Sequence, residues 1–140
     1  MMDLLGDASF QRLEAALQAS SLRQQVLANN VANVDTPYFK RSDVAFEELL
    51  SQAMGQGGTQ DLAGRRTDPR HIPIGNEGPV PAPQVVTDSS TAINNNRNNV
   101  DIDKEMALMA ENQLRYNLFV QQVNEHIRLL KIGINGRSGA

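Results

Sequence analysis

The sequence contains no cysteine and no tryptophan among its 140 residues. The absence of cysteine excludes disulfides, zinc–thiolate sites and thiol nucleophiles, and it is compatible with either redox compartment. Aromatic residues make up only 4% of the chain, whereas a compact enzyme core usually buries more large rings. The length allows one modest domain, and its core must come from aliphatic side chains.

An excess of basic charge and long apolar runs are also missing. Lysine and arginine number 13 against 16 acidic residues, a net charge of −3, which argues against a protein that coats nucleic acid. No apolar run approaches the roughly 20 residues that cross a bilayer. Residues 1–7 carry two acids and no base, so we expect no secretory signal and, by ordinary routes, a cytoplasmic location.

Helix-breaking residues are concentrated in the middle of the chain. Five of the six prolines lie between Pro69 and Pro83, and six of the ten glycines lie between Gly55 and Gly78. Residues 55–99 are therefore expected to be turn-rich, extended or mobile chain, with residues 84–87 as the best candidate strand. The expected divisions are an N-terminal helix over 1–36, a linking region over 37–99 with a possible short helix and strand, and a C-terminal helix over 100–140.

The N-terminal segment carries apolar residues at alternating three- and four-residue steps, the heptad pattern of a coiled coil. The positions are Phe10, Leu13, Leu17, Ser20, Gln24, Leu27, Val31 and Val34. A second stripe on another face consists of Ala15, Ala19, Leu22 and Val26. Because Pro37 disfavours helical geometry at the preceding residue, we expect this helix to end near Asp35.

The C-terminal segment repeats the heptad pattern more fully. Its positions are Met106, Met109, Gln113, Tyr116, Val120, Val123, Ile127, Leu130 and Ile134. Further apolar residues lie off this seam: Leu114, Leu118, Phe119, Leu129 and Ile132. Asp101 is a good N-cap and Gly136 a good stop. The two seams would run roughly 37 and 43 Å.

These patterns predict a mainly α fold in which long N- and C-terminal helices pair as a coiled coil, joined by an extended middle with little regular structure. One helix pair cannot cover four apolar stripes, since helices that are apolar on several faces need several neighbours. The missing neighbours are expected to be other copies or other proteins. The chain therefore reads as an assembly subunit.

No group of residues composes an active site. Asp101, Asp103 and Glu105 resemble the start of a calcium loop, but Met106 and Asn112 occupy the positions that need glycine and glutamate, so helix capping is favoured. His71 and His126 have no partner at metal-binding spacing and are expected to be structural or solvent-facing. Glu47 and Glu48 are read as a solvated helix face. We expect no enzyme activity, cofactor, metal or small-molecule substrate.

An asparagine cluster ends the first helix, where this residue has poor helical propensity. Asn29, Asn30 and Asn33 could simply belong to a fraying helix end and turn. Alternatively, their carboxamides lie on a packed face and fix the register between helices, as a buried polar residue does in coiled coils. We favour the second interpretation.

Residues 27–40 resemble the signature of bacterial flagellar rod and hook proteins, approximately Ala-Asn-Asn-Ile-Ala-Asn-x-x-Thr-Pro-Gly-Tyr-Lys. The residues concerned are Leu27, Ala28, Asn29, Asn30, Val31, Ala32, Asn33, Thr36 and Pro37. The chain departs from the pattern at Tyr38-Phe39, so the glycine that would take a positive φ after Pro37 is missing. Residues 99–101 with Glu105-Met106 resemble the start of the family's C-terminal helix. The short length and residues 110–116, with a weaker echo at residues 71–73, look most like the proximal rod members.

The resemblance implies a non-catalytic subunit of the proximal rod whose terminal helices pack as a coaxial tube, connect the membrane ring and export gate to the rest of the rod, and transmit torque. It implies residence in the periplasmic rod of the basal body, reached through the flagellar type III apparatus without a cleaved signal. The implied partners are further copies, rod proteins of the FlgC, FlgF and FlgG types, the FliE adaptor, and membrane-ring and export-gate proteins. Phe46 and Leu50 resemble the export-gate motif of such subunits, although simple amphipathic packing explains them equally well.

The heptads alone would also allow a cytoplasmic coiled-coil adaptor or chaperone-like module. Such an adaptor should form a stable small oligomer, whereas a rod subunit should be a poorly structured monomer before export. A small hydrolase is the weakest alternative, because no nucleophile, base and orienting group can be assembled from the chain.

Overall fold

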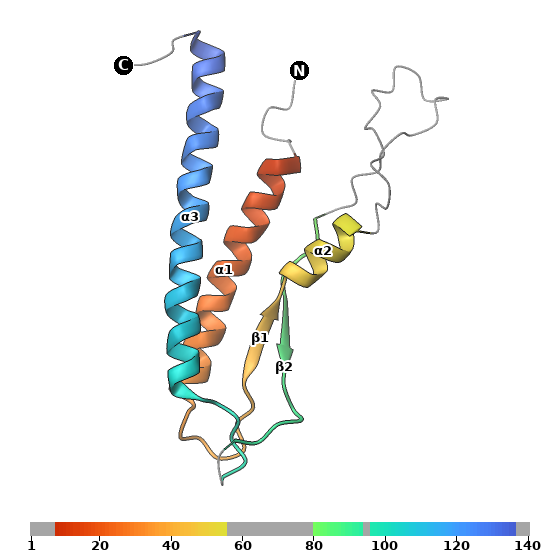
Figure 1. Ribbon diagram of the computed structural model, residues 1–140, viewed down its shortest axis with the longest axis vertical. Helices are drawn as coiled ribbons and strands as arrows, with labels where there is room; N and C mark the ends of the chain where they lie inside the picture. Colours follow the sequence, from red (N-terminus) through yellow and green to blue (C-terminus); the bar gives the residue numbers. More distant parts are fainter. Residues whose placement is uncertain (1–7, 56–79, 94–95, 137–140) are drawn as a thin grey trace, which may run out of the picture.

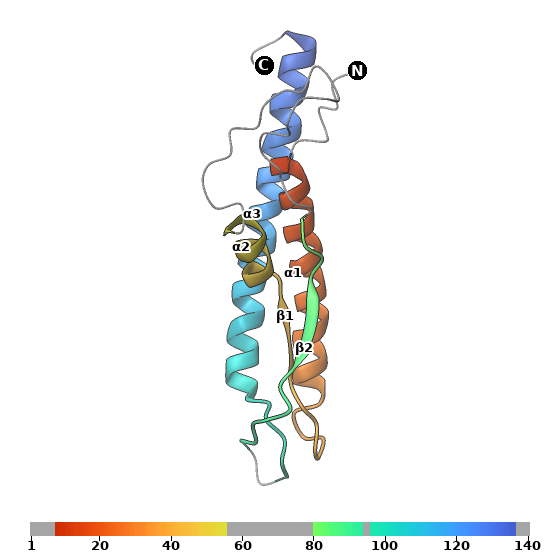
Figure 2. The ribbon, with the colours of Figure 1, turned by 90° about the vertical axis from the view of Figure 1, so that its right-hand side faces the viewer.

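The computed structural model describes residues 8–55, 80–93 and 96–136. Their elements follow the order α1 (Ala8–Ala32), β1 (Ser42–Ala45), α2 (Glu47–Gly55), β2 (Gln84–Thr87) and α3 (Ile102–Asn135). Figure 1 shows α1 and α3 paired side by side, as the sequence predicts, and running antiparallel. In Figure 2, β1, β2 and α2 all lie over one face of this helix pair.

The heptad seam of α1 faces α3, as predicted. Leu27 is 1% exposed and Ser20 is buried, and the side-chain amide of Asn112 on α3 donates to the Ser20 carbonyl at 2.9 Å and to Gln24 Oε1 at 3.0 Å. At the other end of the pair, the rings of Phe10 and His126 stack with centroids 5.4 Å apart. The two polar positions of the seam therefore contribute hydrogen bonds between the helices, and His126 has a packing role.

The second stripe of α1 is covered from within the same chain, which corrects the expectation that its neighbours are other molecules. Ala19 forms a buried cluster with Val44 of β1 and with Phe46, the residue between β1 and α2. Leu22 and Val26 pack against this cluster. The stripe is filled because the chain after α1 turns back along it, a course that the heptad pattern does not specify.

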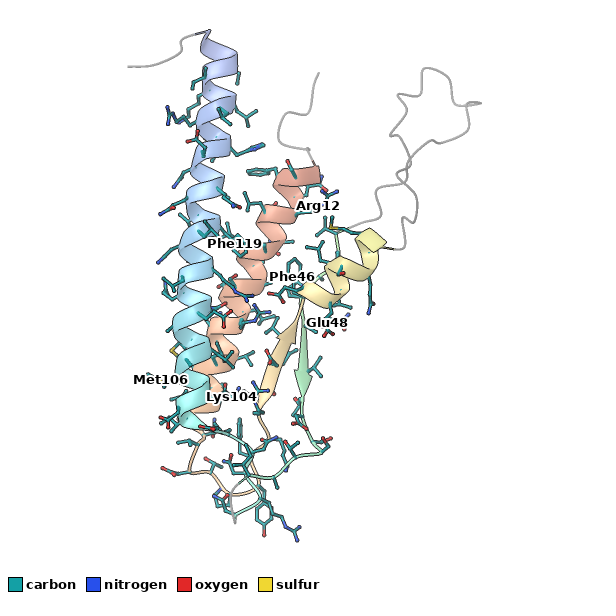
Figure 3. All side chains as sticks on the ribbon, in the orientation of Figure 1. Arg12, Phe46, Glu48, Lys104, Met106 and Phe119 are labelled. Carbon is teal, nitrogen blue, oxygen red and sulfur yellow. The ribbon has the colours of Figure 1, made fainter. Side chains whose placement is uncertain are left out.

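The face of α3 that meets α1 differs in part from the predicted seam. Glu105 and Asn112 are buried, whereas Met106 and Gln113 are exposed, and Met106 points away from α1 in Figure 3. Tyr116 is about one-third exposed, at 37%. Ile134, the last predicted position, is 70% exposed. The remaining predicted positions are half-buried: Met109, Val120, Val123, Ile127 and Leu130. An apolar pattern misplaces the first half of the seam because the residues buried there are polar and satisfied by tertiary hydrogen bonds.

Both predicted caps of α3 are confirmed. The Asp101 carboxylate accepts from the backbone N–H groups of Asp103 at 3.1 Å and Lys104 at 3.3 Å. At the other end Gly136 adopts φ 61° and donates from its backbone N–H to the Ile132 carbonyl. Asp101 thus satisfies donors of the first turn, and glycine takes the left-handed conformation without a Cβ clash.

The strand over residues 84–87 is confirmed and pairs antiparallel with β1, with Ser42 opposite Thr87 and Ala45 opposite Gln84. Strand β1 was not predicted from the sequence, whereas the short helix expected between residues 37 and 99 is α2, which has nine residues. The mobile chain expected around His71 lies outside the described residues. None of the described helices is both long enough and apolar enough to span a bilayer.

Candidate assembly site

Asn30, near the end of α1, links three segments through its side-chain amide. Its Nδ2 donates to the Ser42 carbonyl at 2.8 Å and to Glu105 Oε2 at 2.9 Å, and its Oδ1 accepts from the Ser42 backbone N–H at 3.0 Å. Asn30 is almost fully buried. One carboxamide therefore fixes α1, the start of β1 and the first turn of α3 relative to one another.

Glu105 completes this contact from the α3 side. Its side chain is 0% exposed, and Oε1 accepts from Arg41 Nε at 2.9 Å. Partial burial acts to lower the pKa of the Arg41 guanidinium, but the hydrogen bond and charge of Glu105 outweigh it and raise that pKa above its ordinary value. The buried carboxylate is thus both paired and hydrogen-bonded, as burial of a charge requires.

Asn98 and Asn99, in the segment before α3, hold the loops at the same end of the molecule. Asn98 Nδ2 lies 2.9 to 3.0 Å from the carbonyl oxygens of residues 33, 34 and 36. Asn99 Nδ2 donates to the Asp88 carbonyl at 2.9 Å, and its Oδ1 accepts from the Arg41 backbone N–H at 2.6 Å. We call these five residues the polar lock: Asn30, Arg41, Asn98, Asn99 and Glu105.

The structure supports each of the two interpretations of the asparagine cluster for a different residue. Asn30 is on a packed face and bridges to α3, as the register interpretation requires. Asn33 belongs to the turn, where its Nδ2 donates to the Asn29 carbonyl at 2.8 Å and its Oδ1 accepts from the Thr36 hydroxyl at 3.2 Å. Asn29 is exposed. The remaining signature residues lie around this helix end. Leu27 is buried, Val31 is half-buried, and the exposed ones are Ala28, Ala32, Thr36 and Pro37.

The sequence did not predict the hydrogen bonds of four members of the polar lock. Asn98 and Arg41 were not singled out, and Asn99 entered only through the resemblance of residues 99–101 to the start of the family's C-terminal helix. Glu105 was read as a helix-terminus charge, and it does lie in the first turn of α3. The sequence feature that could have indicated these hydrogen bonds is the high density of asparagine in two separate segments, one near residue 30 and one near residue 98.

Tyr38 adopts φ 63° although it is not glycine. Its backbone N–H donates to the Asn96 carbonyl at 3.0 Å, and its side chain is exposed. The positive φ implied by the signature therefore persists where the chain lacks the signature glycine. A left-handed tyrosine costs of order 1 kcal/mol, which this backbone hydrogen bond helps to offset.

An ion-pair ladder crosses from α1 through α2 to α3. Glu47 contacts both Nη atoms of Arg23, at 2.6 and 2.7 Å, and lies 3.3 Å from Arg115 Nη1. Arg115 also pairs with Glu111 at 2.6 Å. The hydrogen bond from Arg23 is the main cause that lowers the pKa of the Glu47 carboxyl. Glu47 lies on an exposed helix face, as expected, and in the folded chain Arg23 and Arg115 also converge on it.

Leucines of α3 form an exposed stripe on a face turned away from α1. Leu114 is 71% exposed, Leu118 51% and Leu129 58%. Residues four apart, or eleven apart over about three turns, share one helix face. We call these three residues the leucine stripe. An apolar row of this kind on a helix suits contact with another protein.

The described residues hold no cluster of three or more His, Asp or Glu side chains placed to bind a metal ion. Asp101, the first residue of the calcium-loop resemblance, uses its carboxylate to cap α3. The described residues instead present an exposed apolar row on α3 and a buried polar cluster that joins the two terminal helices.

Comparison with known proteins defines the class. Residues 11–40, which contain most of α1 and the signature turn, match the family described as flagella basal body rod protein. The matched region includes the end of α1, the asparagines at positions 29, 30 and 33, and the turn that follows.

Relatives that match over most of the chain identify the family within this class of protein. The chain is 35% identical over 132 residues to the flagellar basal body rod protein FlgB of Bacillus subtilis, covering 94% of this chain and 97% of that protein. It is 35% identical to FlgB of Borreliella burgdorferi, over 83% of this chain and 87% of the relative. The FlgB of Escherichia coli is 32% identical, over 91% of this chain and 93% of the relative. The chain belongs to the FlgB family of flagellar basal body rod proteins, a family of structural proteins and not of enzymes.

Proposed function

We propose that this chain is a structural subunit of the proximal rod, assembled by coaxial packing of its terminal helices, and that it connects the membrane ring and export gate to the rest of the rod and transmits torque. The leucine stripe carries this proposal. It lies along α3, the longest helix, and its exposed apolar area would be removed from water by neighbouring subunits, at about 25 cal/mol per Å².

The polar lock supports the torque-bearing part of the proposal. A subunit under load must not let its helices slide, and the lock joins the end of α1 to the start of α3 through buried, charge-assisted hydrogen bonds. Such bonds are stronger than neutral ones and specify one geometry. Load on α3 would pass to α1 and to the connecting loops with little change in register.

Partners and route follow from the same role. Further copies and rod proteins of the FlgC, FlgF and FlgG types would meet the helix pair, and the FliE adaptor with membrane-ring and export-gate proteins would meet the base of the rod. Delivery would use the flagellar type III apparatus without a cleaved signal. Most of the assembly residues proposed from the signature and from α3 lie on this helix pair.

Electron microscopy of basal bodies from a strain without this gene tests the role. Membrane rings that lack a rod, restored by the wild-type gene, are the expected result. Complete rods in the deletion strain would contradict it and would favour an adaptor function for the exposed leucines.

A further inference from the structure

Strand β2 forms an exposed edge of the two-stranded sheet. In Figure 1, α1, β1 and β2 follow one another across the molecule, with β2 outermost of the three. Strand β1 packs against α1, and β2 packs against β1. All four residues of β2 are exposed, including Val85 at 50% and Val86 at 54%. Two β-branched side chains therefore lie open on the outer strand.

The edge of β1 that faces α1 is covered by side chains of that helix. The Asn30 carboxamide hydrogen-bonds both the carbonyl and the N–H of Ser42, at 2.8 and 3.0 Å. Arg23 donates to the Val44 carbonyl at 3.0 Å. These bonds show that Ser42 and Val44 direct their backbone groups towards α1 and away from β2. One edge of the sheet is thus satisfied within the chain.

The strand register then fixes which backbone groups of β2 point outward. Ser42, which faces α1, lies opposite Thr87, and Val44 lies opposite Val85 in the same way. Opposed residues in an antiparallel pair either both face the partner strand or both face away from it. The N–H and C=O groups of Val85 and Thr87 therefore point away from β1. Among the described residues, none outside the ladder hydrogen-bonds to these four groups.

This outer edge carries none of the usual protection against pairing. Natural edge strands are blunted by charged side chains, by proline or by a bulge. Residues Gln84–Thr87 contain no charge and no proline, and their pairing with β1 runs without a bulge. An edge of this kind suits β-augmentation, in which an extended peptide joins a sheet through main-chain hydrogen bonds.

We propose that the outer edge of β2 binds an extended segment of another protein as a third strand. Val85 and Thr87 each donate and accept one backbone hydrogen bond, and the segment places apolar side chains beside Val85 and Val86, on opposite faces. Pairing of β2 with β2 of a second copy is two-fold symmetric and closes on itself, so it would not extend a rod. The inference rests on the proposed rod function and adds a contact made by the strands rather than by the terminal helices.

Proline substitution in the full-length chain tests the edge. Proline at position 85 removes an N–H that does not pair with β1, and an edge strand tolerates proline in this orientation. In the deletion strain, Val85→Pro should accumulate normally and fail to restore swimming. Val85→Thr keeps both the N–H and the β-branched shape and should restore it. Swimming of Val85→Pro at the wild-type rate would overturn the proposal. If Val85→Pro does not accumulate, Thr87→Pro removes the other outward N–H and takes its place.

Photo-cross-linking in motile cells identifies the occupant. A benzophenone amino acid replaces Gln84 in one strain and Thr87 in another, and the linked peptides are identified by mass spectrometry. Because both strands of a ladder rise equally per residue, the two sites should link to positions about three residues apart in one segment of another protein. A helix laid along the edge would give a separation of about seven residues. That separation, the absence of adducts, or adducts only with this chain or a second copy would each contradict the proposal.

The outcome is separable from that of the rod function. Rods missing from the deletion strain, together with normal swimming of Val85→Pro, would leave the rod role intact and remove the strand contact. Complete rods in the deletion strain would remove the role itself, and the cross-links would then report on the β2 edge alone.

Discussion

The carboxylate of Glu105 accepts a hydrogen bond from the carboxamide of Asn30 at 2.9 Å, across 75 positions of sequence and with both side chains buried. A buried acid held by an asparagine and by Arg41 ties the two terminal helices together. Removing one partner would leave an uncompensated charge or donor in the interior, which is costly.

Replacement of Glu105 should therefore destabilise the fold strongly. Glu105→Ala removes the buried acceptor that Arg41 and Asn30 share and should lower the free energy of unfolding by about 3 kcal/mol. Urea denaturation followed by circular dichroism measures this. Glu111→Ala, which removes only an exposed pair with Arg115, should cost less than about 1 kcal/mol. Equal effects in the two variants would contradict the buried role of Glu105.

A glycine at position 38 should stabilise the chain. Tyr38 has φ 63° and an exposed side chain, so Tyr38→Gly relieves the left-handed strain and loses little packing, for a gain of about 1 kcal/mol. The backbone hydrogen bond to Asn96 is retained. Thermal unfolding measures the gain. Asp35→Gly, at a position without positive φ, serves as the control and should destabilise; a loss of stability in Tyr38→Gly would be inconsistent with strain there.

The ladder predicts a pH dependence at Glu47. The hydrogen bond from Arg23 lowers the pKa of this carboxyl in the folded state, so its contribution is present above the unfolded pKa and is lost as the pH falls through the folded value. Stability should decline below about pH 4.3, and Glu47→Gln should flatten part of that decline. Because the Glu47 carboxylate is half exposed, its contribution to this decline in stability is at most about 1 kcal/mol. Identical acid profiles for the variant and the wild type would exclude this contribution.

Substitutions in the helices should separate folding from assembly. Leu27→Asp places a charge at a position 1% exposed and should unfold the subunit, so it does not report on assembly alone. Leu118→Glu lies in the exposed leucine stripe and should change the free energy of unfolding by less than about 0.5 kcal/mol, while motility and rod formation are lost. Swimming of Leu118→Glu at the wild-type rate would remove the stripe from the interface.

Substitution of Phe46 can distinguish a role in export from a role in core packing. Phe46 and Val44 belong to one buried cluster, so Phe46→Ala and Val44→Ala should both weaken the fold, by about 3 and 2 kcal/mol. If Phe46 and Leu50 also form an export signal, an assay of secreted subunit should show a loss for Phe46→Ala alone. Equal secretion of both variants would assign Phe46 to packing.

Local patterns predicted what depends on neighbours along the chain. The heptad spacing defined the α1 seam and the paired helices, Asp101 and Gly136 defined the ends of α3, and β-branched residues marked β2. These features follow from periodicity and from the hydrogen-bonding needs of helix ends. The course of residues 33–46 back along α1 has no such periodic signal, so β1 was missed and the second stripe of α1 was assigned to other molecules.

The sequence by itself determined the helices, their caps and the family signature, because each depends on residues within a few turns of one another. Only the tertiary structure decided which polar groups are buried. Asn30, Asn98 and Glu105 resemble helix-end and linker residues until distant segments bring their partners within hydrogen-bond distance. A polar residue is stable in the interior only when those partners are present, and their positions depend on the course of the whole chain.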